Sequence, residues 1–485
     1  MNNISHSVCP VIPEHVFNNI ARNGGRVAAG NARSTLEQMR EIGHRRIHRA
    51  VVSDLVVQSA VGALNRRRNV YTALHRQQLP GKLVMSEHKA RGTDIDVNQA
   101  YDGAGATFDF YARVHGRNSI DNRGMRIDST VHYSVGFDNA MWDGRQMVYG
   151  DGDGILFTSF TGQLEVIAHE ITHGVTQHSA NLGYFGETGA LNEHVSDVEG
   201  ILVKQFTFRQ TARESDWYIG KGLFTNAVRG KAIRSMAAPG TAYDDPVLGR
   251  DPQPAHMRDY VDTDDDNGGV HINSGILNHA FYLNAIALGG YAWEVAGTIW
   301  YVTLTERLPS SAGFDDFAQL TIDVAGEMFG NGGRVQQIVI ANWFKVGLLP
   351  RLPPTQSPIA PRPQPTPLTT NIRKENTIMS TEHTDLQHNH ITASMNTLGV
   401  MENSAIADTP NGRVQHLVKI YGRVKPFLLL LSTLVVLPTS WRDGIKVFIG
   451  ALDAVAVVAP QLGPGEIITI DDPQPVPEFK AGKDL

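Results

Sequence analysis

The sequence predicts an α+β protein with a β-rich lobe, a mainly helical lobe and an extra helical hairpin near the C-terminal end. In residues 80–160, apolar and polar positions alternate among Gly, Asn and Asp turn residues, as expected for strands. In residues 161–349, apolar residues recur at helical spacing instead. We expect helices there at Ile272–Leu288, Ala292–Glu306, Phe314–Phe329 and Val335–Val346.

The most specific motif of the chain is His169-Glu170-Ile171-Thr172-His173, a match to HExxH. Two histidines four residues apart lie on one face of a helix, so both imidazoles can reach one metal ion, and the glutamate between them can act on metal-bound water. The alternative is a surface helix with two solvated histidines. Apolar neighbours at helical spacing favour a partly buried helix and therefore a zinc hydrolase.

A catalytic zinc site needs a third protein ligand and an open position for water. Glu193 follows His173 by 20 residues, and the turn residues between them allow a second helix to return toward the first. Asp197 lies one turn after Glu193 and can accept the second ring N–H of a ligating histidine. Asn192 is a further candidate for that outer contact. The alternative for Glu193 and Asp197 is an exposed acidic helix face.

With these motifs in order, the chain resembles the thermolysin family of zinc metallopeptidases over about residues 80–349. Further segments carry the resemblance: Asn139–Gly144 with Gln146–Gly154, Ile233–Met236 and Asn267–Gly275. Two others, Gly240–Pro246 and Asp251–Met257, are similar to the protealysin-like branch, which has a short prosegment. The resemblance implies a two-lobed endopeptidase with one catalytic zinc in the cleft between the lobes.

The resemblance also implies roles for individual residues. Glu170 would be the general base, while Tyr184 and His271 would stabilise the oxyanion and Asp266 would orient His271. Arg234 would bind the carbonyl of the residue after the cut. Asn139 and the Ala140 carbonyl would hold the substrate as an added strand. Ordinary turn or edge roles remain the alternative for Tyr184 and Asn139.

An apolar pocket would select bulky apolar residues just after the cleavage point. Phe157, Val166 and Ile233 are the candidates for its lining, and they are equally typical of an ordinary core. Protein and peptide substrates are the expected partners. The competing function is a catalytically idle or regulatory binding protein that acts through the C-terminal module. The presence of all three ligands and Glu170 favours the enzyme.

Thermolysin binds calcium through acidic residues near its active-site helices, and this chain departs from that pattern. Glu165 and Asp216 are still acidic, but Lys204, Tyr218 and Lys221 stand where carboxylates are expected. An ammonium group cannot coordinate calcium, so we predict that the double calcium site is absent. Other acidic loop residues are interpreted as solvated carboxylates rather than calcium ligands: Asp151, Asp153 and Asp262–Asp266.

Residues 1–60 are predicted to be a basic prosegment, largely helical over 11–50, followed by the β-rich catalytic lobe at 61–160 and the helical lobe at 161–350. Residues 1–76 carry a net charge of +7 and the remainder −13, so the prosegment would dock by charge as well as packing. Residues 51–65 are small and apolar, and we expect self-cleavage there. Arg66-Arg67-Arg68 lacks interleaved aromatic residues, which argues against nucleic-acid binding.

The only cysteine, Cys9, lies in the prosegment, so no disulfide can form within one chain. Its thiolate could occupy the open zinc position, although an incidental small residue is the simpler interpretation. The N-terminus lacks a basic region followed by an apolar one, so no Sec signal peptide is visible. Because family members are usually extracellular, we expect non-classical secretion or a cytoplasmic protein.

Residues 351–412 are predicted to be a linker, proline-rich and extended over Pro353–Pro367 and polar beyond. A histidine tract in it, His383, His388 and His390, is interpreted as solvated rather than metal-binding. Residues 413–485 are predicted to be a helical hairpin module of unknown role.

The hairpin would begin with the apolar run Phe427–Leu437, which is eleven residues long. A bilayer span needs about 20 residues, so no transmembrane segment is predicted. Ser440 and Asp443 resemble a capping box that opens a second helix, Gly444–Val458. Residues 413–462 would pack on themselves or a protein partner. The alternative is contact with a membrane surface, favoured by Lys419, Arg423 and Lys425.

Overall fold

The computed structural model describes residues 9–50, 64–348, 425 and 449. Contacts divide the chain into two units, Met1–Thr355 and Gln356–Leu485. The predicted linker, the C-terminal hairpin and most of the predicted cleavage region lie outside the described residues.

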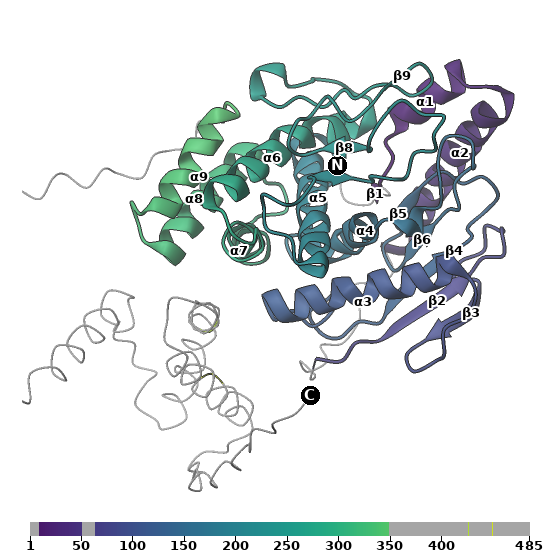
Figure 1. Ribbon diagram of the computed structural model, residues 1–485, viewed down its shortest axis with the longest axis horizontal. Helices are drawn as coiled ribbons and strands as arrows, with labels where there is room; N and C mark the ends of the chain where they lie inside the picture. The colour runs from purple at the N-terminus through teal and green to yellow at the C-terminus, as the bar shows by residue number, and fades with distance from the viewer. Residues whose placement is uncertain (1–8, 51–63, 349–424, 426–448, 450–485) are drawn as a thin grey trace, which may run out of the picture. The chain divides into compact units, whose positions relative to one another are not determined.

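A six-stranded sheet forms the framework of the N-terminal lobe (Figure 1). Its strands β2, β4 and β6 are parallel neighbours, and the remaining pairs are antiparallel. In spatial order the strands are β1 (Cys9–Pro10), β5 (Ala140–Trp142), β6 (Met147–Tyr149), β4 (Ile127–Val131), β2 (Arg68–Thr72) and β3 (Lys82–Ser86). The edge strand β1 belongs to the predicted prosegment and pairs with the predicted substrate-binding strand β5.

The predicted helices of the C-terminal lobe are confirmed. Ahead of them lie α1 (Glu14–Asn23), α2 (Arg26–Ala50) and α3 (Ile95–His115), and the lobe contains α4 (Leu164–Gln177), α5 (Gly186–Phe208), α6 (Asp266–Leu288), α7 (Ala296–Val302), α8 (Phe314–Phe329) and α9 (Arg334–Lys345). Short helical turns occupy Phe160–Gly162, Met257–Asp259 and Thr303–Arg307, the last a π-helix. Two small ribbons pair β7 (Tyr218–Ile219) with β8 (Arg234–Ser235) and β9 (Asp244–Asp245) with β10 (Gly249–Arg250).

The β-rich lobe is confirmed, but helix α3 inside it was not predicted. Asp94 caps its first turn, with the side chain accepting a hydrogen bond from the Val97 N–H at 3.1 Å. Gly116 ends the helix in the left-handed conformation, at φ 65°. Gly103 and Gly105 in the middle weaken the helical pattern in the sequence. A Cβ at Gly103 would lie 2.5 Å from Ile167, so this glycine allows α3 to approach α4.

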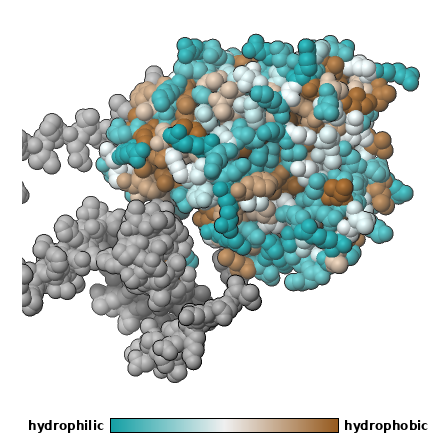
Figure 2. All heavy atoms as spheres, in the orientation of Figure 1, coloured by the Kyte–Doolittle hydropathy of each residue, from teal (hydrophilic) through white to brown (hydrophobic). Residues whose placement is uncertain are grey.

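Two buried apolar clusters hold the unit together. The first joins the sheet to α4 and to prosegment residues Val16 and Phe17 of α1. The second fills the helical lobe around Trp300, Phe317 and Trp343. Figure 2 shows apolar side chains as separate patches on a mainly hydrophilic visible face. Among the described residues, no helix is both long and apolar enough to cross a membrane.

Helices α4 and α5 cross closely, and this crossing positions the predicted metal ligands. Gly200 makes it possible, because a Cβ at this residue would lie 2.6 Å from the Glu165 carbonyl oxygen. Helix α4 is buried on all sides, as expected for a central helix whose sequence is mostly apolar or small. The HExxH residues therefore belong to the interior and not to a solvated surface helix.

Candidate active site

His169 and His173 lie on one face of α4, as their spacing predicts, and the Nε2 atoms are 3.0 Å apart. Glu193 reaches them from α5, with carboxylate oxygens 3.4 Å from each Nε2 atom. All three side chains are buried. Zinc bonds of about 2.0–2.1 Å at tetrahedral angles separate ligand atoms by about 3.3 Å, so this triad fits a zinc ion.

The opposite ring nitrogens of both histidines contact oxygen atoms. His169 Nδ1 lies 2.9 Å from Asp197 Oδ1, and His173 Nδ1 lies 2.9 Å from the Asn192 side-chain oxygen. Ser196 Oγ is also 3.1 Å from His173 Nδ1. A proton on each Nδ1 leaves the Nε2 lone pairs directed at the metal position. Asp197 and Asn192 thus occupy the outer positions that the sequence predicted.

Arg234 comes from β8 and binds Asp197 in a two-pronged contact, with both nitrogen–oxygen distances at 2.8 Å. Burial opposes ionisation of Asp197, but Arg234 and His169 hold the pKa of its carboxyl well below the usual range. The Asn278 amide donates a third hydrogen bond to this carboxylate at 2.8 Å. A buried charge with three such contacts is compensated, so Asp197 can fix His169 and Arg234 together.

Glu170 is also completely buried, one residue after the first ligand. Burial, opposed by the neighbouring His169, raises the pKa of the Glu170 carboxyl to about 8. A pKa near neutrality suits a group that must take up and then release a proton in one reaction cycle.

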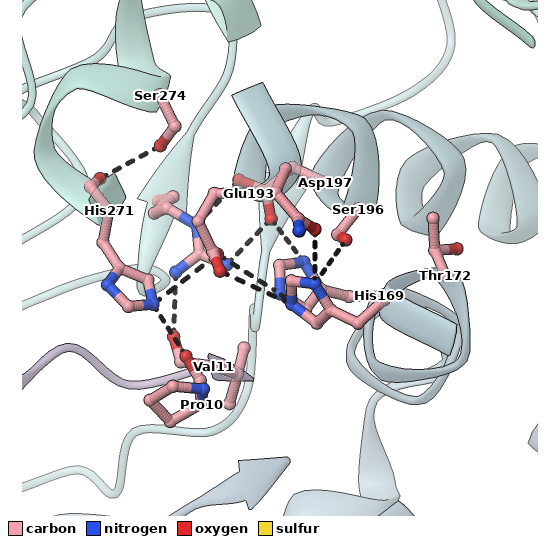
Figure 3. Close-up of polar contacts among 12 residues, drawn as sticks. Pro10, Val11, His169, Thr172, Glu193, Ser196, Asp197, His271 and Ser274 are labelled. Carbon is pink, nitrogen blue, oxygen red and sulfur yellow. Dashed lines mark hydrogen bonds and ion pairs between the residues drawn. The ribbon is translucent and has the colours of Figure 1, made fainter. Parts of the chain in front are cut away.

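His271 lies on the other side of Glu193 from His169, with its Nε2 3.6 Å from a Glu193 oxygen (Figure 3). Tyr184 Oη donates to Glu193 and lies 3.3 Å from His271 Nε2. Asp266 holds the His271 ring through Nδ1 at 2.6 Å and accepts the His271 backbone N–H at 2.9 Å. Burial opposes protonation of His271, but Asp266 and Glu193 raise the pKa of its ring to about 9. His271 is therefore suited to donate a proton to a developing negative charge.

Residues of the predicted prosegment pair with the predicted substrate-binding strand β5, a placement that the sequence did not indicate. Val11 N–H donates to the Ala140 carbonyl at 3.1 Å. The Asn139 side chain accepts from Ile12 N–H at 2.9 Å and donates to the Ile12 carbonyl at 3.1 Å. The motif Cys-Pro-Val-Ile-Pro is short and has no distinctive spacing, so the sequence offered no signal for this placement.

Two catalytic candidates contact the same prosegment strand. The Pro10 carbonyl lies 2.7 Å from His271 Nε2, and the Val11 carbonyl accepts from Arg234 Nη1 at 2.8 Å (Figure 3). Cys9 is buried beside Tyr184 and Val270. The predicted prosegment thus contacts His271 and Arg234, and His271 Nε2 lies 3.6 Å from the triad residue Glu193.

The three predicted pocket residues, Phe157, Val166 and Ile233, are buried in one apolar cluster that also contains Val11. Two supporting residues were missed at the sequence level. Gln253 donates to the His271 carbonyl at 2.8 Å, and Asn278 supports Asp197. Gln253 belongs to the segment Asp251–Met257 that resembles the protealysin-like branch, but nothing in that segment points to a contact with His271. Asn278 lies 81 residues after Asp197, and no motif marks it.

Comparison with known families accounts for this arrangement. Residues 58–177 match the thermolysin metallopeptidase catalytic domain, and residues 180–348 match the thermolysin metallopeptidase alpha-helical domain. The chain belongs to the thermolysin metallopeptidase family. The family resemblance derived from the motifs is thereby confirmed, and the chain is a zinc metalloendopeptidase. Zinc is the family's metal, and His169, His173 and Glu193 form a site that fits it.

This thermolysin-family chain is similar to several named proteins. An extracellular metalloprotease of Pectobacterium carotovorum subsp. carotovorum is 46% identical over 345 residues, which cover 71% of this chain and 97% of the relative. Protease PrtS of a Photorhabdus species is 42% identical over 341 residues, or 70% and 91% of the two chains. The solved precursor of protealysin from Serratia proteamaculans is 46% identical with a TM-score of 0.64, and the match covers 70% of this chain and all of that one. The match to a precursor supports the protealysin-like branch.

Proposed function

We propose that this endopeptidase cuts peptide bonds on the N-terminal side of bulky apolar residues. The observation that carries the proposal is the prosegment strand on β5. Its Pro10 carbonyl faces His271, its Val11 carbonyl faces Arg234, and its Val11 side chain is buried in the same cluster as Phe157, Val166 and Ile233. A substrate strand that adopted the same register would place its scissile bond at the position of Pro10–Val11.

Each side chain then has one task. Glu170 takes a proton from the attacking water and passes it to the leaving amine. His271 and Tyr184 donate hydrogen bonds to the oxygen of the attacked carbonyl, with Asp266 orienting His271. Asn139, the Ala140 carbonyl and Arg234 hold the substrate backbone on the C-terminal side of the cut, as they hold Val11 and Ile12. Zinc bound by His169, His173 and Glu193 would act as a Lewis acid and lower the pKa of a water molecule toward neutrality.

A series of peptides that differ only in the residue after the cut tests the specificity. Leu, Phe, Ile or Val at this position should give kcat/KM at least about 100-fold above Asp, because a carboxylate in an apolar pocket is strongly disfavoured. The measurement is cleavage of a quenched fluorescent peptide, with product masses to locate the cut. Activity must disappear with a zinc chelator and return with zinc. Equal rates for Leu and Asp would refute the pocket assignment.

We further propose that residues 1–60 are an inhibitory prosegment and that the chain removes it itself. The contacts of Pro10, Val11 and Ile12 support inhibition, because they occupy hydrogen-bonding groups that would bind substrate. The protealysin precursor supports synthesis of this chain as a zymogen. Self-cleavage is expected between residues 51 and 65. The name of a similar extracellular metalloprotease supports secretion of this chain.

The competing function was an idle binding protein that acts through residues 413–485. The described residues do not favour it, because the zinc triad and Glu170 are assembled as an active enzyme requires. Apart from Lys425 and Ile449, the C-terminal module lies outside the described residues.

We also propose that the double calcium site of thermolysin is absent and that a lysine ammonium replaces its charge. Lys204 Nζ lies 3.4 Å from Glu165 Oε1 and 3.1 Å from Asp216 Oδ1. Lys221 Nζ contacts the other Asp216 oxygen at 3.0 Å. Burial raises the pKa of the Glu165 carboxyl, and the neighbouring Lys204 ammonium opposes this shift.

Calcium is therefore expected not to stabilise the protein through the site of Glu165 and Asp216. Millimolar calcium should leave the wild-type melting temperature unchanged, whereas Lys204→Met should lower stability by about 3 kcal/mol because Glu165 loses its buried partner. Lys221→Met is the matched control, since its side chain is 55% exposed and such surface pairs contribute little. Thermal unfolding with and without calcium measures both effects. A calcium-dependent rise in the wild-type melting temperature would contradict the proposal.

A further inference from the structure

A second group of metal-binding side chains lies outside the catalytic site, at the carboxyl ends of three parallel strands. His132 directly follows β4, Asp151 lies two residues after β6, and His75 lies three residues after β2. Because β2, β4 and β6 are parallel neighbours, the loops after them meet at one edge of the sheet.

The side chains of these three residues converge. Asp151 Oδ1 is 2.8 Å from His132 Nδ1, and Asp151 Oδ2 is 3.3 Å from His75 Nδ1. The two ring centroids are 5.5 Å apart. One donor atom from each residue lies within 4.8 Å of the others, so a single ion can contact all three after small side-chain rotations.

The backbone holds both histidines in place. His75 N–H donates to the His132 carbonyl at 2.9 Å, and Ser134 N–H donates to the Arg76 carbonyl at 3.1 Å. Both histidines have left-handed backbone angles, with φ of 57° for His75 and 54° for His132. Non-glycine residues adopt this conformation at a cost of about 1–2 kcal/mol, and such residues often mark functional sites.

Asp94 contacts the ring nitrogen of His132 that faces away from Asp151, as an outer carboxylate contacts a metal-bound histidine. Its Oδ2 lies 3.0 Å from His132 Nε2, while its Oδ1 caps helix α3. With a proton on Nε2 donated to Asp94, His132 directs the lone pair of Nδ1 at Asp151. A carboxylate behind an imidazole in this manner is typical of metal-bound histidines.

We propose that His75, His132 and Asp151 bind a second divalent transition-metal ion of the zinc type. Two imidazole nitrogens and one carboxylate suit zinc and its neighbours, whereas calcium and magnesium require mainly oxygen ligands. The His75 side chain is 57% exposed, so water can complete the coordination. The ion would join three loops, one of which leads from His132 into the substrate strand β5, and would therefore stabilise the β-rich lobe.

Two neighbouring carboxylates do not offer a better site. Asp153 Oδ1 already accepts the backbone N–H groups of Ile155, Leu156 and Phe157. Asp96 accepts hydrogen bonds from Ser159 and Thr161. The competing explanation for the cluster is an ion pair without metal, in which His132 is a cation between Asp151 and Asp94. The experiment must separate these two states.

The test is titration of the zinc-loaded full-length chain with further zinc, followed by calorimetry and elemental analysis. Every protein carries Glu170→Gln to prevent self-cleavage and glutamine at His383, His388 and His390, so that the histidine tract cannot bind the added ion. We expect zinc to rise from one to two ions per chain, with a micromolar or lower Kd. Added zinc should also raise the melting temperature.

Variants assign the second ion to the cluster. His75→Ala, His132→Ala and Asp151→Ala should each weaken its binding by at least about 100-fold, and Asp94→Asn by about 10-fold. The asparagine keeps the helix cap. His88→Ala is the matched control, because His88 is exposed, lies in the same lobe and also has a positive φ, 64°. It should bind the second ion like the parent.

His75→Ala decides the outcome if the more buried His132 variant fails to fold, since it leaves both His132 contacts in place. A parent chain that binds only one zinc ion would show that the cluster is an ion pair and would overturn the proposal. A second ion that persists in His75→Ala with unchanged Kd would also overturn it, because the ion would then lie elsewhere.

Discussion

The substitution Glu170→Ala is expected to abolish peptidase activity while the protein keeps its catalytic zinc. Glu170 is buried beside the triad but supplies none of its three ligands. Loss of a general base lowers rates by about 10²–10⁴-fold, and we expect kcat to fall by at least about 10³-fold. Peptide cleavage measures the rate, and elemental analysis should still find one catalytic zinc per chain.

The same variant tests self-processing. If the chain removes its own prosegment, Glu170→Ala should remain full-length when it is purified, and a trace of wild-type enzyme should restore the cut. Glu327→Ala, a change at a glutamate whose side chain is 51% exposed, is the control and should process and cleave normally. A Glu170→Ala chain that is cut within residues 51–65 in the absence of wild-type enzyme would show that another protease performs the processing.

The second large effect is expected from Val11→Asp, which should release the prosegment from the cleft. Val11 is fully buried, and its backbone contacts Ala140 and Arg234. Burying an unpaired carboxylate costs several kcal/mol, so the uncut variant should spend far more time with an open cleft. We expect initial rates on a short peptide at least about 10-fold above those of the uncut wild-type chain.

Intact mass must be recorded with each rate, so that activity of uncut protein is separated from activity of processed protein. Val27→Asp is the matched control, because this prosegment valine in α2 is 59% exposed and its replacement should leave the uncut chain inhibited. If uncut Val11→Asp is as inactive as uncut wild type, the prosegment does not inhibit through this contact. The specificity proposal would then lose its main support, although the zinc site would be unaffected.

Much of the active site could be predicted because the spacing of its residues along the chain follows helix geometry. The spacing of His169 and His173 places them one helical turn apart in any helix, and Asp197 follows Glu193 in the same way. The structure places His271, Asp266 and Arg234 where the family resemblance put them. Helix α3 was missed because its interior glycines weaken the periodic pattern, and close packing against α4 compensates for them.

By itself, the sequence identified the family, the site of His169, His173 and Glu193, a candidate general base and the order of the lobes. These properties depend on residues that lie close together in the sequence and on motifs that indicate the same chemistry in any fold. Only the tertiary structure decided that the segment Cys9–Ile12 lies along β5, that Lys204 faces Glu165, and that His75, His132 and Asp151 meet. Each of these contacts joins residues far apart in the chain. Their proximity follows from strand order and helix packing, which no local pattern encodes.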